Sequence, residues 1–86
     1  MRIQVEDSRT GKVIKLDVQE HHKIERIVDI IIKNLGIIST EQRTYTLVLG
    51  DKELPPTITV EDAVHKFGLK DNDKLALWAR VVGGLF

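Results

Sequence analysis

The chain has 86 residues, enough for one small domain, and its 13 basic residues balance 13 acidic ones. This balance argues against a general nucleic-acid binder, and no run of like charge predicts a membrane-binding patch. The absence of cysteine excludes disulfides, thiolate zinc sites and cysteine nucleophiles. Because no transmembrane-length apolar run and no signal-peptide pattern are present, we expect a domain in the cytoplasm. We also expect it to be a monomer.

The first two segments alternate polar and apolar residues, which is the pattern of half-buried strands. We expect one strand over residues 2–6 and a second over residues 13–18. Residues 7–12 lie between them and include Gly11, which readily takes the positive φ of a tight turn. The two strands and this turn predict a β-hairpin.

A helix is expected over residues 23–35. Apolar residues recur there at spacings of three and four and form one stripe, comprising Ile24, Ile27, Val28, Ile31 and Leu35. Gly36 follows as the residue that ends the helix. No Ser, Thr, Asp or Asn immediately precedes residue 23, so no capping side chain is evident. Ile30 and Ile32 lie off the stripe and either widen the buried face or leave an exposed apolar patch.

The connector 37–43 leads to a third strand, which we expect over residues 44–49 because β-branched and aromatic residues are frequent there. A short strand is expected over residues 52–54. Pro55 and Pro56 then interrupt regular structure.

Thr59 is expected to cap a short second helix, with Asp62 three residues later in a variant of the capping box. The buried side of this helix is expected to comprise Ala63, Val64 and Phe67. Gly68 would end it.

The last strand is expected over residues 74–80. Strand alternation predicts that Leu75, Leu77 and Ala79 point inward, whereas Ala76, Trp78 and Arg80 point outward. With a hairpin, one crossover helix and three later strands, the expected fold is α+β of the β-grasp type, a mixed sheet packed on one main helix. We place the domain at residues 1–80 and a C-terminal tail at residues 81–86.

The tail contains Gly83 and Gly84, followed by Leu85 and Phe86. A diglycine has no side chain to bury, so at the end of a domain it forms a thin, extendable segment. Such a segment fits a narrow enzyme channel that any Cβ atom would block. The alternative is a frayed terminus without a function.

The chain resembles ubiquitin from end to end. The matching segments are residues 1–5 in the first strand, 10–18 in the first turn and second strand, 24–27 and 36–37 at the two ends of the helix, 47–54 in the next hairpin, and Leu75, Leu77, Arg80 and Gly83-Gly84 in the last strand and tail. The resemblance implies a β-grasp fold and a protein modifier of the prokaryotic, archaeal type.

In this family the diglycine carboxylate is the reactive group. An activating enzyme adenylates it with ATP, and it then passes through a thiol, with a conjugating enzyme as a further partner, to a lysine of a target protein. The resemblance therefore implies a precursor from which a zinc-dependent peptidase of the deubiquitinase type removes Leu85 and Phe86, cutting between Gly84 and Leu85. Arg80 matches a basic residue that the family's activating enzymes read.

Three positions match the small apolar patch with which ubiquitin recruits partners, namely Arg9, Val48 and Trp78. An exposed Trp78 beside Val48 would be an interface hot spot, whereas a shifted strand would bury its ring in the core. Lys12 and Lys52 match lysines that accept further copies of the modifier in chain formation; ordinary solvated lysines are the alternative.

The sequence shows no nucleophile–base pair, phosphate loop or paired-carboxylate motif, so we expect neither an enzyme nor a cofactor. His21, His22 and His65 have no carboxylate or cysteine at ligand spacing, so no metal site is expected. Two other functions remain open. One is a sulfur carrier with a thiocarboxylate at Gly84, and the other is a non-conjugated interaction module that binds through the sheet around Val48 and Trp78.

Overall fold

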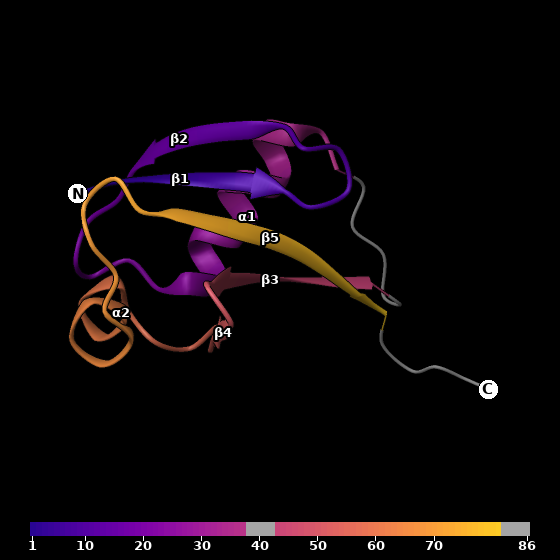
Figure 1. Ribbon diagram of the computed structural model, residues 1–86. Coiled ribbons are helices and arrows are strands. Elements are labelled where there is room, and N and C mark those ends of the chain that lie inside the picture. Colours follow the sequence, from indigo (N-terminus) through magenta and orange to yellow (C-terminus); the bar gives the residue numbers. More distant parts are fainter. Residues whose placement is uncertain (38–42, 82–86) are drawn as a thin grey trace.

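A computed structural model of the chain describes residues 1–37 and 43–81 (Figure 1). The elements in these residues are β1 (Arg2–Asp7), β2 (Val13–Asp17), α1 (Ile24–Leu35), β3 (Arg43–Leu49), β4 (Lys52–Leu54), α2 (Val60–Phe67) and β5 (Lys74–Val81). Every element expected from the sequence is present. The bounds of the strands and of α1 differ from the expected ones by at most one residue at either end.

Three strands are longer than expected because their end residues pair with a neighbouring strand. β1 continues through Asp7, one residue beyond the expected end, because Asp7 pairs with Leu77 in the parallel ladder to β5. Arg43 pairs with Val81, which adds one residue to β3 and one to β5. Val81, the first residue of the expected tail, therefore lies in β5. β2 stops before Val18, contrary to expectation.

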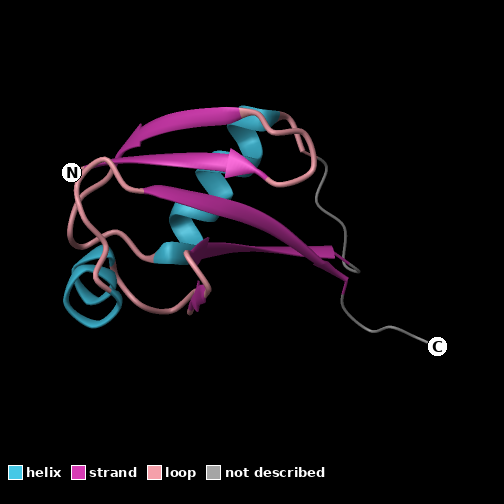
Figure 2. Cartoon of the chain, in the orientation of Figure 1, coloured by secondary structure: helices cyan, strands magenta, loops and turns pink. Residues whose placement is uncertain are grey.

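The strands form one mixed sheet in the order β2-β1-β5-β3-β4. β1 and β5 are parallel, whereas the β1–β2, β3–β5 and β3–β4 pairs are antiparallel. α1 lies across one face of this sheet, and α2 lies beyond its end, near the start of β1 (Figures 1 and 2). This α+β arrangement is compatible with a β-grasp roll.

The core fills the space between α1 and the sheet. α1 contributes Ile24, Ile27, Val28 and Ile31, and the strands contribute Ile3, Val5, Leu47, Leu54, Leu75 and Leu77. Ile32 also packs against this core, so it widens the buried face of the helix. Ile30, in contrast, is 37% exposed and leaves an apolar side chain on the outer surface of α1. Burial of this set is the main favourable term in the stability of the domain.

The N-terminus of α1 is capped by backbone rather than by a side chain. Lys23 is extended and acts as the N-cap without a side-chain hydrogen bond, so the helix begins one residue later than expected. The N–H of Ile24 donates to the carbonyl of Ile58 at 2.9 Å, and that of Glu25 donates to the carbonyl of Pro56 at 2.9 Å. These carbonyls satisfy N–H groups that a helix leaves without an internal partner.

The N-terminus of α2 is held in the reciprocal way. The N–H of Val60 donates to the carbonyl of His22 at 2.8 Å, and that of Glu61 donates to the carbonyl of Glu20 at 3.0 Å. Thr59 and Asp62 form the expected capping box, and Gly68 ends the helix in the left-handed conformation. The segments that precede the two helices therefore cap each other.

Candidate partner-binding surface

The outer face of β5 carries the most exposed large apolar side chain of the described residues. Trp78 is 52% exposed, whereas Leu75 and Leu77 on the same strand are only 2% and 1% exposed. This pattern confirms the predicted alternation, in which the leucines point inward and Trp78 points outward. The alternative of a shifted strand with Trp78 in the core is wrong.

Strand pairing brings further apolar residues next to Trp78. Ala76 shares its face of β5, and Val48 of β3 pairs directly with Ala76. Both are partly buried. Val48, Ala76 and Trp78 thus share one face of the neighbouring strands β3 and β5 and form an apolar surface, which we call the outer patch. The structure therefore places two of the three predicted partner-binding residues on one surface.

Polar groups surround the outer patch. The Nζ of Lys74, two residues before Ala76 on β5, lies 2.6 Å from Oε1 of Glu6, which pairs with Ala76 from β1. On the other side, the Thr46 hydroxyl donates to Oε1 of Glu53 at 3.0 Å. An apolar centre with a polar rim is the usual composition of a protein–protein interface.

Arg9, the third predicted residue, does not join the outer patch. Its guanidinium lies 5.8 Å from the ring centroid of Tyr45, which shares the helix-facing side of β3 with Leu47. Its Nη2 also lies 3.3 Å from Oδ2 of Asp7, a residue that is only 3% exposed. The Arg9 side chain is thus drawn to the side of the sheet opposite Trp78.

Asp7 organises the turn that carries Arg9. Oδ1 of Asp7 accepts the backbone N–H of Arg9 at 2.9 Å, and its backbone carbonyl accepts the N–H of Gly11 at 2.8 Å. Burial raises the pKa of the Asp7 carboxyl, but hydrogen bonds from the Arg9 side chain, the Arg9 backbone and the Thr10 hydroxyl outweigh burial. The pKa of Asp7 therefore lies below its ordinary value. The sequence predicted Asp7 only as part of the turn, although an Asp that opens a turn is a known signal for such bonds.

The other predicted site residues are separate from the outer patch or lie outside the described residues. Lys12 and Lys52 are exposed, one in the turn before β2 and the other at the start of β4, near opposite edges of the sheet. Arg80 pairs with Thr44 in the β5–β3 ladder. The diglycine and the predicted cleavage site, formed by Gly83, Gly84, Leu85 and Phe86, lie outside the described residues.

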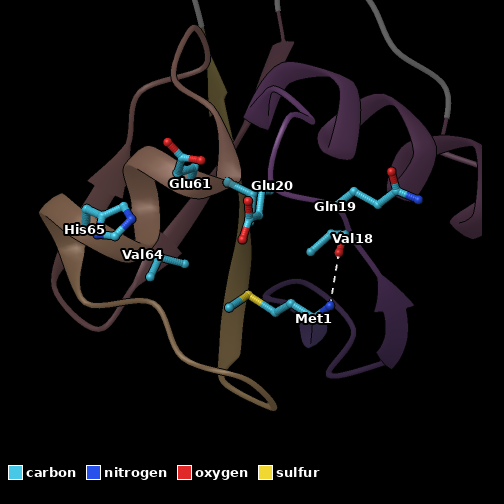
Figure 3. A pocket seen from close by; sticks show the side chains of 8 residues that line it. Met1, Val18, Gln19, Glu20, Glu61, Val64 and His65 are labelled. Carbon is cyan, nitrogen blue, oxygen red and sulfur yellow. Dashed lines mark hydrogen bonds between the residues drawn. The ribbon is translucent and has the colours of Figure 1, made fainter.

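A shallow hollow of about 370 Å³ lies between α2 and the start of β1 (Figure 3). Half of its eight lining residues are apolar, namely Met1, Val18, Val60 and Val64. Glu20 and Glu61 lie at its upper rim in Figure 3, brought together by the hydrogen bond between their backbones. Sequence analysis did not anticipate this hollow, because its lining comes from three separate segments.

Within residues 1–37 and 43–81, no group of His, Cys, Asp or Glu side chains is arranged to hold a metal ion. No helix among these residues is both long and apolar enough to cross a membrane. No protein-family model matches the chain, and no curated protein matches its sequence. The function must therefore be argued from the residues and their geometry.

Proposed function

We propose that this chain is a ubiquitin-like protein modifier with a β-grasp fold, made as a precursor that is cleaved after Gly84. The observation that carries the proposal is the position of β5, which lies in the middle of the sheet and leads directly toward the diglycine. This strand order, β2-β1-β5-β3-β4, supports the resemblance of the sequence to ubiquitin.

A central last strand suits a protein that reacts at its C-terminal end. β5 is hydrogen-bonded on one side to β1 and on the other to β3, and its side chains Leu75 and Leu77 are buried. An enzyme can therefore bind and extend the tail without detaching β5 from the core. From Val81 to Gly84 an extended chain spans at most roughly 10 Å, which limits how far an enzyme channel could hold the reactive carboxylate from the end of β5.

The proposed chemistry needs only a free carboxylate at Gly84. The carboxylate attacks the α-phosphorus of ATP and displaces pyrophosphate, which gives an acyl adenylate. An enzyme thiol then displaces AMP and forms a thioester, and the amine of a target lysine displaces the thiol and forms an isopeptide bond. The chain supplies the carboxylate, and the activating enzyme and the later conjugating enzyme supply the catalytic groups.

The outer patch is the proposed docking surface for these enzymes. Trp78 is a large, rigid and exposed side chain at one end of an apolar surface with a polar rim, and tryptophan is enriched among interface hot spots. Trp78 is also near the start of the tail, since only Ala79 and Arg80 separate it from Val81. A partner bound on the outer patch would therefore lie close to the segment on which it acts.

The test is the intact mass of the protein recovered from its own cells. Loss of Leu85 and Phe86, together with adducts in which Gly84 is joined to lysines of other proteins, is the expected result. A trimmed species in which sulfur replaces one oxygen of the carboxylate would instead assign a sulfur carrier. A full-length mass in every fraction would overturn both conjugation and sulfur transfer.

A non-conjugated interaction module is the second candidate function, and the exposure of Trp78 specifically favours it. Such a module would bind its partner through the outer patch alone. Deleting residues 83–86 would then leave binding and cellular function unchanged, whereas a modifier would lose its function entirely.

Replacing Trp78 by alanine is expected to lower kcat/KM for activation or trimming by roughly tenfold or more, because a hot-spot contact is lost. Ile30→Ala is the matched control, since Ile30 is also an exposed apolar side chain but lies on α1 on the other side of the sheet. The control should stay within about twofold of the wild type. Equal kinetics for the two variants would show that the outer patch is not the docking surface.

A further inference from the structure

The segment of residues 19–23 lies between β2 and α1 and contacts the start of α2. Its carbonyl groups at Glu20 and His22 accept the N–H groups of Glu61 and Val60, as described above. Lys23 also forms an isolated antiparallel bridge with Thr59. The shape of this segment therefore determines whether the first turn of α2 keeps its hydrogen bonds.

Two hydrogen bonds fold the segment on itself. The N–H of His22 donates to the carbonyl of Gln19 at 3.0 Å, and the N–H of Gln19 donates to Nδ1 of His22 at 3.1 Å. A ring nitrogen can accept a hydrogen bond only while it carries no proton. The observed segment therefore requires a neutral His22 with its proton on Nε2.

Charged groups of both signs surround His22. From the same segment, His21 places its ring centroid 4.7 Å from that of His22, and Lys23 follows directly. A second hollow, at the start of α1, is lined by the two histidines and Lys23 together with Glu25 and Arg26 from α1. From α2, Glu61 reaches the segment through the carbonyl of Glu20, two residues before His22. The lining of the second hollow thus contains two basic side chains, those of Lys23 and Arg26, and one acidic side chain, that of Glu25.

We propose that His22 is a pH-sensitive switch that opens the 19–23 segment and releases the start of α2 when Nδ1 is protonated. The proton comes from solvent and occupies the Nδ1 lone pair. The Gln19 N–H then loses its acceptor and faces a second donor. Histidine is the side chain that normally changes charge between roughly pH 5 and pH 8. This inference does not depend on the proposed role as a modifier.

Amide hydrogen exchange of the full chain, followed by NMR at about pH 7.5 and about pH 5.5, tests the switch on both sides of the histidine range. Protection factors are corrected for the intrinsic pH dependence of exchange. At the lower pH we expect the amides of Gln19, Val60 and Glu61 to lose roughly fivefold in protection, the equilibrium factor of one net hydrogen bond. The amides of β5 serve as the internal reference and should not change.

His22→Asn is the matched variant, because its Oδ1 can accept the same bond but does not titrate. It should keep the protection of Gln19, Val60 and Glu61 at both pH values. His21→Asn removes the neighbouring titratable ring and should keep the pH dependence of the wild type. The ¹⁵N shifts of the His22 ring at neutral pH should report a proton on Nε2.

Three results would overturn the switch. The first is equal protection of these amides at both pH values in the wild type. The second is a pH dependence that persists unchanged in His22→Asn. The third is a neutral His22 ring with its proton on Nδ1, which would show that the bond to Gln19 does not exist in solution. The wild-type measurements decide the question even if a variant fails to fold.

Discussion

Gly84→Val is expected to abolish the covalent adducts of this protein and to slow adenylation by about a hundredfold or more, because a branched side chain displaces the reacting carboxylate in its channel. The substitution should not change the stability of the domain, since the buried core lies between Ile3 and Leu77. Adducts are measured by denaturing electrophoresis and mass spectrometry, and adenylation is measured by ATP–pyrophosphate exchange with the purified activating enzyme.

Two controls separate the parts of this prediction. Val82→Ala changes the tail without adding bulk next to the carboxylate, so it should retain adducts. A chain that ends at Gly84 should be adenylated without the peptidase, whereas the full-length chain should require trimming first. Adducts of normal abundance from Gly84→Val would contradict the proposed role of the diglycine carboxylate.

Local sequence patterns predicted the strands and α1 to within one residue because their physical causes are local. Alternation with a period of two distinguishes Leu75 and Leu77 from Trp78, and the structure buries the first two and exposes the third. The spacing of three and four along α1 similarly identified its buried stripe. The sequence therefore predicts whether a residue is buried when burial depends only on the face of the helix or strand that the residue occupies.

The capping of α1 was not predictable because it depends on a contact between distant segments. The sequence has no capping side chain before α1, so no side-chain signal marks where the helix begins. In the structure, the carbonyls of Pro56 and Ile58 replace the missing side chain. No local pattern reports such a bond, since these carbonyls are more than 30 residues from Lys23 in the chain.

The side of the sheet on which the Arg9 side chain lies was also not predictable from the sequence. Its position in the chain matched a residue of the apolar patch in ubiquitin, which suggested that it would lie beside Trp78. Its side chain instead follows the buried carboxylate of Asp7 and the ring of Tyr45 to the helix-facing side. The contacts with Asp7 and Tyr45, and not the position of Arg9 in the sequence, determine which side of the sheet its side chain occupies.

Asp7→Ala is expected to destabilise the domain by about 3 kcal/mol. The change removes a buried acceptor of charged and backbone hydrogen bonds and leaves the N–H of Arg9 without its partner. Chemical denaturation at neutral pH measures this difference. Asp17→Asn is the control, because Asp17 pairs with Arg2 at 3.1 Å on the exposed surface and should therefore contribute little.

The contribution of Asp7 should also depend on pH, and the sign follows from its lowered pKa. A carboxyl whose pKa is lower in the folded state than in the unfolded chain stabilises the fold while it is ionised. This stabilisation is fully present above the unfolded pKa of about 3.9 and disappears as the pH falls through the lower folded pKa.

Asp7→Asn removes the titration while nearly preserving the shape of the side chain. The difference in unfolding free energy between wild type and Asp7→Asn should therefore be constant near neutral pH and shrink progressively below about pH 4. A difference that stays constant into strong acid would show that the buried carboxylate gains no stability from its charge, and that Arg9 is held against Tyr45 by packing alone.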